Sequence, residues 1–216
     1  MARPREFDED AVLDIAIKQF WLNGYEATSV RELASNMGLA GASLYNAFGD
    51  KRSLYRRALE RYWDQTFRER VGRLEEGTPA DSAIRTFFGE IIDRAATDKR
   101  KRGCMLVNST LESVSGDPER RRIADAFLRE AESFFLRCVT AGQKEGTITK
   151  SQARGDLARM LPVQLLGIRV LARRNSDRDI LEAAIRPVFA LLFDESRRKP
   201  GRRARRRIVG ASSNAG

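Results

Sequence analysis

The chain has 216 residues, of which 42% are hydrophobic and 32% charged, as is typical of a folded globular protein. It contains no histidine and two widely separated cysteines, Cys104 and Cys138, which excludes a serine–histidine triad, a Cys-x-x-Cys pair and most zinc sites. The formal net charge is +10, but residues 197–207 hold eight basic residues and no acidic one, so the total charge alone does not indicate DNA binding.

The apolar periodicity predicts an all-α fold. A first helix is expected over residues 8–23, with acidic residues at its start and Gly24 after its end. A second helix follows Thr28 or Ser29, where Ser29 and Glu32 have the spacing of a capping box. Gly38 ends that helix, and a short third helix covers residues 42–47.

The rest of the chain is also expected to be helical. The predicted helices cover residues 51–74, 79–97, 103–113, 118–145, 150–174 and 177–196. Pro162 and Pro187 fall inside the last two helices and predict a kink in each. We expect a DNA-binding domain over residues 1–50, a larger helical domain over 51–196 with helix 51–74 linking the two, and a disordered basic tail over 197–216.

The segment "SLYNAF", residues 43–48, is short and unusually polar for a helix between two apolar ones. Two helices around a tight glycine-containing turn, braced by a preceding helix, indicate a helix-turn-helix unit. In that unit Ser43, Tyr45 and Asn46 would face a DNA duplex, while Leu44 and Phe48 would face the core. The alternative from spacing alone is a connecting turn with solvated side chains.

The residues from 8 to 57 closely resemble the N-terminal segment of the TetR family of bacterial transcriptional regulators. The resemblance is carried in register by Phe20, Gly24, Tyr25, Thr28, Val30, Leu33, Ala34, Gly38, Leu44, Tyr45, Phe48 and Lys51. "GCMLVNSTLE" and "LLGIRVLAR" are similar to segments in one branch of the family's ligand-binding domain. The resemblance implies an all-helical homodimer that binds a near-palindromic DNA operator, most often as a repressor, and is released when a small-molecule effector enters the C-terminal domain.

The resemblance also implies individual roles for residues of this segment. Thr28, Tyr45 and Lys51 would hold phosphates, and the groove would be faced by Gly41, Ala42, Ser43 and Asn46. Many family members have serine at the position of Ala40 and lysine at the position of Gly41. The third helix here therefore lacks a capping hydroxyl, which typically costs about 0.5–2 kcal/mol, and one phosphate contact.

The C-terminal domain offers candidates for dimerisation and for effector binding. Residues 156–172 and 180–193 are apolar around more of their circumference than a surface helix requires, so they form either a dimer surface or the monomer core. Aromatic side chains of the middle helices, among them Trp63, Phe67 and Phe88, are either core residues or the lining of an effector cavity.

Cys104 is a candidate redox-sensing residue. It follows four basic residues and begins a predicted helix, and both features favour a reactive thiolate. Similar segments occur in family members that sense electrophiles or oxidants. The alternative is a small buried apolar residue, which is how Cys138 is interpreted.

The sequence leaves other functions open but favours them less. The basic tail is either a solvated end or a DNA-seeking arm, and in the second case the protein would be a nonspecific nucleic-acid-binding protein. A helical enzyme or carrier is disfavoured by the lack of histidine and of paired acidic motifs. No cofactor, metal or membrane partner is expected, and the absence of a signal peptide or a membrane-spanning apolar run predicts a cytoplasmic protein.

Overall fold

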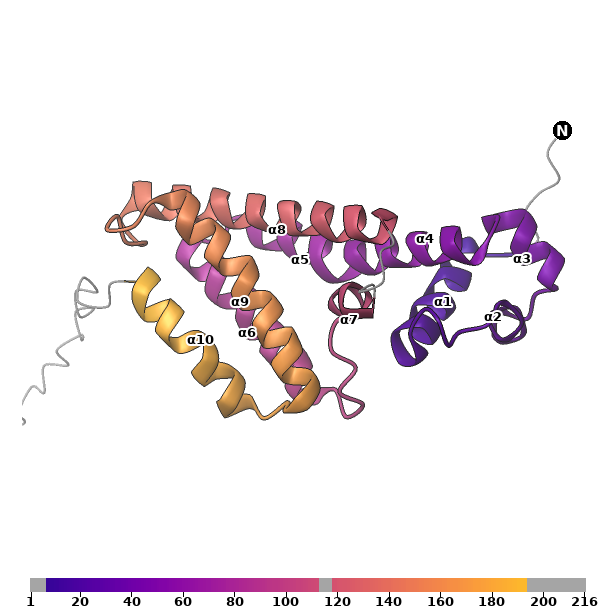
Figure 1. The fold of residues 1–216 in the computed structure, drawn as a ribbon. Coiled ribbons are helices and arrows are strands. Elements are labelled where there is room, and N and C mark those ends of the chain that lie inside the picture. Colours follow the sequence, from indigo (N-terminus) through magenta and orange to yellow (C-terminus); the bar gives the residue numbers. More distant parts are fainter. Residues whose placement is uncertain (1–6, 113–117, 194–216) are drawn as a thin grey trace, which may run out of the picture.

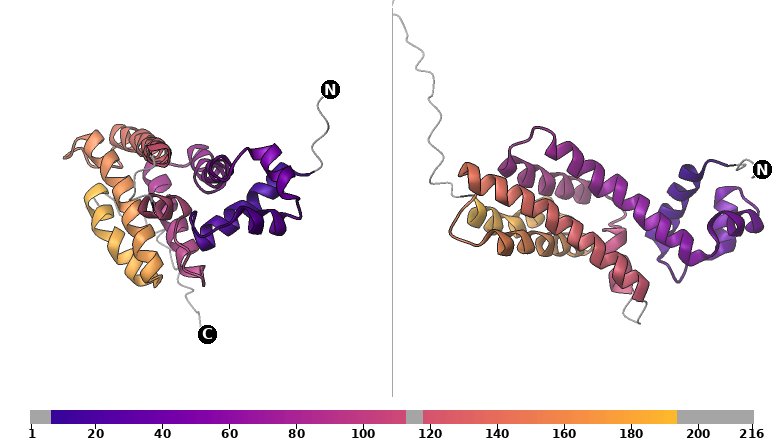
Figure 2. Two further views of the ribbon diagram at one scale, coloured as in Figure 1. Left: turned by 45° about the vertical axis from the view of Figure 1, so that its right-hand side comes forward. Right: turned by 90° about the horizontal axis from the view of Figure 1, so that it is seen from above.

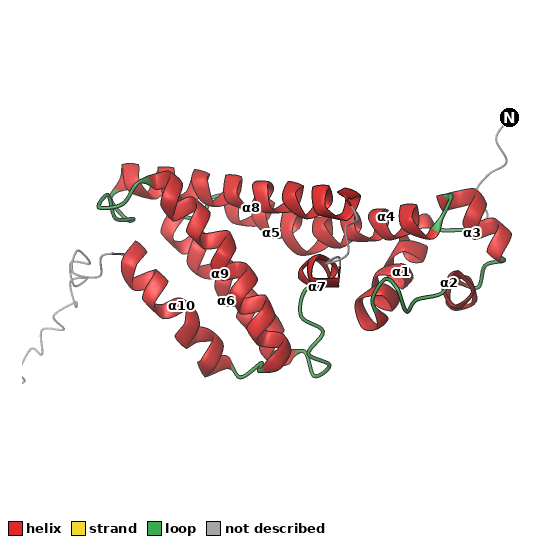
Figure 3. Cartoon of the chain, viewed as in Figure 1, coloured by secondary structure: helices red, strands yellow, loops and turns green. Residues whose placement is uncertain are grey.

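The computed structural model describes residues 7–112 and 118–193, which form helices joined by turns, without strands (Figure 3). The first three helices are α1 (Glu9–Asn23), α2 (Val30–Met37) and α3 (Gly41–Phe48), and they group at one end of the molecule (Figure 1). The remaining helices form an elongated body beside this group (Figure 2). The all-α prediction is confirmed.

Local capping explains where the N-terminal helices begin and end. The Asp8 carboxylate accepts from the backbone N–H groups of the first turn of α1. Ser29 and Glu32 form both hydrogen bonds of the predicted capping box at the start of α2. Gly38 ends α2 in the left-handed conformation with φ 65°, which glycine adopts without a steric penalty. Ala40 precedes α3 and supplies no side-chain cap, as its sequence predicts.

One long helical segment joins the two ends of the molecule, although it is not a uniform α-helix. It consists of α4 (Lys51–Trp63), the π-helical turn η1 (Asp64–Arg68) and α5 (Glu69–Glu75). Within it, the Thr66 hydroxyl donates to the Tyr62 carbonyl at 2.6 Å, and the Arg70 guanidinium donates to the Thr66 carbonyl. Such side-chain bonds compete with the regular backbone ladder, which explains a π-turn where an uninterrupted helix was predicted.

The larger domain consists of α6 (Ala80–Thr97), α7 (Met105–Glu112), α8 (Pro118–Glu145), α9 (Arg154–Arg174) and α10 (Arg178–Leu192). Figure 1 shows α8 lying along α5, with α9 and α6 crossing below and α10 on the outside. The core of this domain is aromatic: Phe87, Phe88, Phe134 and Phe135 are fully buried in mutual contact. Such packing fixes the relative positions of α6 and α8.

Most helix boundaries agree with the sequence prediction within a few residues. The two largest shifts are four residues each: α9 begins at Arg154 and not at residue 150, because residues 150–152 form bends, and α10 ends at Leu192 and not at residue 196. Pro162 and Pro187 lie inside α9 and α10, as predicted. The domain boundary at residue 50 stays a prediction. The basic tail lies outside the described residues.

Within the described ranges, no helix is both long and apolar enough to cross a membrane.

Candidate DNA-binding surface and effector cavity

The short helix α3 has two distinct faces. Leu44 and Phe48 are buried and pack into the N-terminal core with Leu54 of α4. On the opposite face Tyr45 is 51% exposed, and Asn46 is exposed beside it. The exposed phenol and amide are hydrogen-bonding groups that point away from the core, so this face can bind the backbone and the base edges of DNA.

The residues predicted to face the groove lie together on that surface. Gly41 and Ala42 are exposed at the first turn of α3, and Ser43 is half-buried next to them. Gly41 has no side chain that would cover the backbone, and a Cβ added at this position would meet open space. The N-terminal turn of α3 can therefore approach another molecule closely.

Lys51 lies at the start of α4, next to this surface. Its Nζ is 4.4 Å from the centroid of the Tyr25 ring and 3.4 Å from the Glu26 carbonyl oxygen. These contacts hold the ammonium beside the N-terminal turn of α4, where the Asp50 carboxylate caps the helix by accepting from the Ser53 backbone N–H at 2.6 Å. The arrangement suits a phosphate of the DNA backbone.

Thr28 differs from the other predicted DNA-binding residues in its burial. It is fully buried, and its hydroxyl donates to the Gly24 carbonyl at 2.6 Å. In this conformation the side chain fixes the turn between α1 and α2, and a role of Thr28 toward a phosphate stays a prediction. Tyr45 and Lys51 remain the accessible members of the predicted phosphate-binding set.

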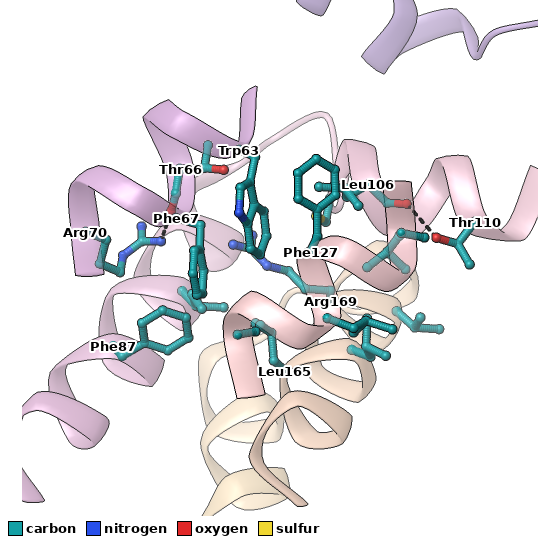
Figure 4. A pocket seen from close by; sticks show the side chains of 18 residues that line it. Trp63, Thr66, Phe67, Arg70, Phe87, Leu106, Thr110, Phe127, Leu165 and Arg169 are labelled. Carbon is teal, nitrogen blue, oxygen red and sulfur yellow. Dashed lines mark hydrogen bonds between the residues drawn. The ribbon is translucent and has the colours of Figure 1, made fainter. Parts of the chain in front are cut away.

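The larger domain contains an apolar cavity of about 190 Å³ between the long segment α4–η1–α5 and the helices α6, α7, α8 and α9 (Figure 4). Its wall is mostly aromatic and aliphatic. The lining includes Trp63, Thr66, Phe67, Arg70, Phe87, Cys104, Leu106, Val107, Thr110, Phe127, Leu165 and Arg169. A cavity with an apolar wall and a few polar groups is the usual form of a small-molecule site.

Trp63 and Phe67, which the sequence offered either as core residues or as the lining of an effector cavity, line this cavity. Their rings stack at a centroid distance of 4.0 Å, and the Trp63 indole donates to the Glu130 carboxylate at 2.7 Å. Phe88 is placed elsewhere: it packs on Phe135 and on Phe189 of α10, outside the cavity lining. The adjacent Phe87 takes the position in the cavity wall because it points in a different direction from α6.

Cys104 is buried in the cavity wall, directly before α7. Its carbonyl accepts from the backbone N–H of Asn108 at 2.9 Å and so starts the helix. Burial, together with the neighbouring Cys104, raises the pKa of the Tyr62 phenol, although Arg169 acts in the opposite direction. The thiol and the guanidinium line the cavity, and the Tyr62 phenol lies close to the thiol.

Cys138 is a core residue on α8, as interpreted from the sequence. Burial raises the pKa of its thiol to about 12. At neutral pH it stays protonated and is a poor nucleophile.

Several connecting residues could not be recognised in the sequence. Glu130 of α8 accepts from Arg68 at 2.8 Å as well as from Trp63, and Glu119 pairs with Arg52 at 3.0 Å. These pairs link α8 to the segment that begins at the DNA-binding surface. Their partners are more than 60 positions apart, so no local pattern predicts them.

The helix α7 connects the cavity to the DNA-binding end. Leu106, Val107 and Thr110 line the cavity, and α7 also packs against α1 and α4. Figure 1 shows α7 between the larger domain and α1. A change in the cavity wall is thus one helix away from the helix-turn-helix.

An exposed polar helix in a helix-turn-helix, joined by one helical segment to a domain with an apolar cavity, defines a transcriptional regulator of the helix-turn-helix class. Residues 12–58 match the family described as bacterial regulatory proteins, tetR family, and residues 80–188 match the tetracyclin repressor-like C-terminal domain. The chain belongs to the tetR family.

Individual relatives agree with this assignment. The uncharacterized HTH-type transcriptional regulator YezE of Bacillus subtilis (strain 168) is 33% identical over 84% of this chain and 94% of its own length. The HTH-type transcriptional repressor ComR of Escherichia coli (strain K12) is 37% identical over 53% of this chain and 56% of its own length.

A solved structure of the TetR family regulator CifR, a cysteine mutant complexed with 26bp operator DNA, has a TM-score of 0.73. It is 31% identical and covers 87% of this chain and 98% of its own length.

Proposed function

We propose that this regulator is a repressor that acts in the cytoplasm by binding and not by catalysis. Two protomers bind a near-palindromic operator through Gly41, Ala42, Ser43 and Asn46 in the major groove, with Tyr45 and Lys51 on phosphates. A small molecule that occupies the cavity, or an electrophile or oxidant that modifies Cys104, releases the operator.

The half-exposed Tyr45 beside Asn46 is the observation that carries the DNA-binding part of this proposal. The phenol can donate to a phosphate oxygen, and the amide can pair with the edge of adenine. The complex of CifR with operator DNA supports the same use of this fold.

An exposed apolar face supports the homodimer. Val163 and Val170 of α9 are 61% and 45% exposed, and Ile180 and Leu191 of α10 are 42% and 43% exposed. Residues 163 and 170 are two helical turns apart and share one side of α9. We refer to these four residues as the apolar face of α9 and α10, and we propose that a second copy of the chain covers it. A two-fold dimer would present both α3 helices to one face of the DNA.

Selection of bound duplexes from a random DNA pool tests the proposed function. We expect the selected sequences to share one near-palindromic motif and footprinting to show a single protected segment over it. Uniform protection along the DNA would contradict the proposal and favour the alternative, nonspecific binding through the basic tail.

Cys104→Ser is expected to bind the selected operator like the wild type but to resist release by N-ethylmaleimide or hydrogen peroxide by about tenfold or more in concentration. Modification of the thiol places new atoms inside the cavity wall next to Tyr62, and a hydroxyl does not react in this way. The measurement is fluorescence anisotropy of labelled operator against reagent concentration.

Cys138→Ser provides the matched control for this experiment and should release operator like the wild type. If Cys104→Ser responds to both reagents as the wild type does, Cys104 is only a core residue and the effector acts by occupancy alone.

A further inference from the structure

The guanidinium of Arg169 lies in the cavity wall, where none of the described residues forms an ion pair with it. The residue is 8% exposed, and it makes no hydrogen bond or ion pair with any residue in the described part of the chain. Figure 4 shows its side chain extending toward Trp63 within the cavity. Buried charges in native proteins are nearly always paired, because an isolated buried cation is costly. Arg169 is therefore a largely buried cation that borders two cavities and has no protein anion paired with it among the described residues.

Neighbouring arginines are paired, which distinguishes Arg169 from them. Arg70, the other arginine of the cavity lining, donates to the Glu90 carboxylate at 2.9 Å. Arg173, one turn further along α9, donates to the Asn108 side-chain oxygen at 3.1 Å. Of the two arginines that line the cavity, Arg169 is thus the one that has no carboxylate partner among the residues that the structure describes.

The remainder of the cavity is suited to an apolar body. Trp63, Phe67, Phe87, Phe127 and Leu165 make up much of its wall. The hydroxyls of Thr66 and Thr110 already donate to backbone carbonyls of Tyr62 and Leu106. The guanidinium fork of Arg169 is consequently the principal polar anchor available to a ligand.

We propose that the effector is a hydrophobic carboxylate whose anionic group pairs with Arg169 while its apolar body fills the aromatic cavity. This inference rests on the proposed function of the cavity as the effector site. A carboxylate carries a single charge and fits the guanidinium fork with two parallel hydrogen bonds. A phosphate monoester would bring further charge, and Glu90 already neutralises Arg70.

The volume of the cavity limits the size of the apolar body. Engineered apolar cavities of about 150 Å³ hold a benzene ring, and this one has a volume of about 190 Å³. An aryl group on a short alkyl chain is therefore a suitable body for the ligand.

Arg169 also lies where the cavity approaches the DNA-binding end. It lines a second cavity of about 180 Å³ together with Trp21 of α1, Arg94 and Arg102. The Arg102 guanidinium lies 4.3 Å from the centroid of the Trp21 ring. A carboxylate that draws Arg169 toward the apolar cavity would change the contacts at the α1 junction.

Calorimetric titration of the full-length protein without DNA tests this inference with two matched probes, 3-phenylpropionate and the neutral 3-phenylpropionamide. We expect the wild type to bind the carboxylate at least about tenfold more tightly than the amide. In Arg169→Met and in Arg169→Gln, the affinities for the carboxylate and for the amide should differ by no more than about twofold. Arg173→Gln, which removes a paired arginine from the same helix, should keep the preference of the wild type.

Thermal unfolding supplies a second readout that confirms folding of the variants. Ligand-free Arg169→Met should unfold at a higher temperature than the wild type, because an unpaired buried charge has been removed. The carboxylate should raise the unfolding temperature of the wild type and not that of Arg169→Met.

Equal affinity of the wild type for both probes, binding of neither probe, or a carboxylate preference that survives in both Arg169 variants would overturn the inference. These measurements involve no DNA, so they are separate from the proposed function. A carboxylate that binds through Arg169 without releasing operator would leave the ligand class in place and contradict the effector role of the cavity.

Discussion

The double variant Tyr45→Ala, Lys51→Ala is expected to lose at least about 100-fold in affinity for the selected operator, because each protomer gives up two phosphate contacts and a hydrogen bond to a charged group contributes about 1.5–3 kcal/mol. Tyr45 is half-exposed and Lys51 lies at the surface end of α4, so neither substitution opens a core cavity. Fluorescence anisotropy with labelled operator measures the loss, and circular dichroism confirms the helical content.

The salt dependence of binding separates the two contributions. Lys51→Ala alone removes one cation from each protomer and should reduce the slope of log K against log salt by about two in a dimer. Tyr45→Ala should weaken binding with little change in that slope, because the phenol is neutral. Lys144→Ala, at the far end of α8 from α3, is the control and should bind like the wild type. Full affinity of the double variant would show that α3 does not lie in the groove.

Lys51 also contributes to the fold, and this effect can be measured separately. Its ammonium lies over the Tyr25 ring, a contact that contributes about 0.5–1 kcal/mol at an exposed site. A small decrease in the unfolding temperature of Lys51→Ala is therefore expected, while the loss of DNA binding should be much larger than this change in stability accounts for.

The helix-turn-helix could be predicted because its determinants are local. The capping box of Ser29 and Glu32, the left-handed glycine at 38 and the apolar positions 44 and 48 all act within one or two helical turns. Short-range patterns of this kind are readable from sequence because each one satisfies the backbone or the core without a distant partner. The division of α3 into a buried and an exposed face follows from the same periodicity.

The cavity could not be assembled from sequence, because its polar groups are defined by distant contacts. Successive side chains of an α-helix point in directions about 100° apart. Whether Phe87 or Phe88 faces the cavity therefore depends on how α6 is rotated about its own axis. Arg169 resembles any other arginine in a helical pattern, and its significance comes from its burial in the cavity wall without an ion-pair partner in the described part of the chain. Thr28 is similar: the sequence shows a hydroxyl at a helix start, and only the turn geometry shows that it donates to Gly24.

The arrangement of α7 and α8 suggests how the cavity and DNA-binding surface are coupled. Glu119 and Glu130 of α8 hold Arg52 and Arg68 on the long segment, and α7 packs between the cavity and α1. A ligand that moves α7 would change the packing of α1, while the ion pairs keep α4 aligned with α8. Because α4 begins directly after α3, a small rotation of this segment changes the distance between the two α3 helices of a dimer.

Besides the contacts of Tyr45 and Lys51, dimerisation is the second feature that we expect to contribute strongly to operator affinity. The double variant Val163→Arg, Val170→Arg is expected to be a folded monomer. It should bind the operator about 10²–10⁴-fold more weakly, because a dimer holds two DNA-binding domains on one operator and linking two binding modules raises the affinity by about this factor. Both valines are exposed in the protomer, and arginine is a good helix former, so the substitutions should leave α9 intact. Sedimentation velocity measures the oligomeric state, and anisotropy measures the affinity.

Leu22→Arg is the matched control for these substitutions, because Leu22 is an exposed leucine of α1 (44%) that lies outside the apolar face of α9 and α10. It should leave the protein dimeric, since a single exposed apolar residue does not form an interface. If the double arginine variant sediments as a dimer with undiminished affinity, another surface holds the protomers together. A monomer that retained full affinity would instead show that one α3 helix is sufficient, which a near-palindromic operator does not permit.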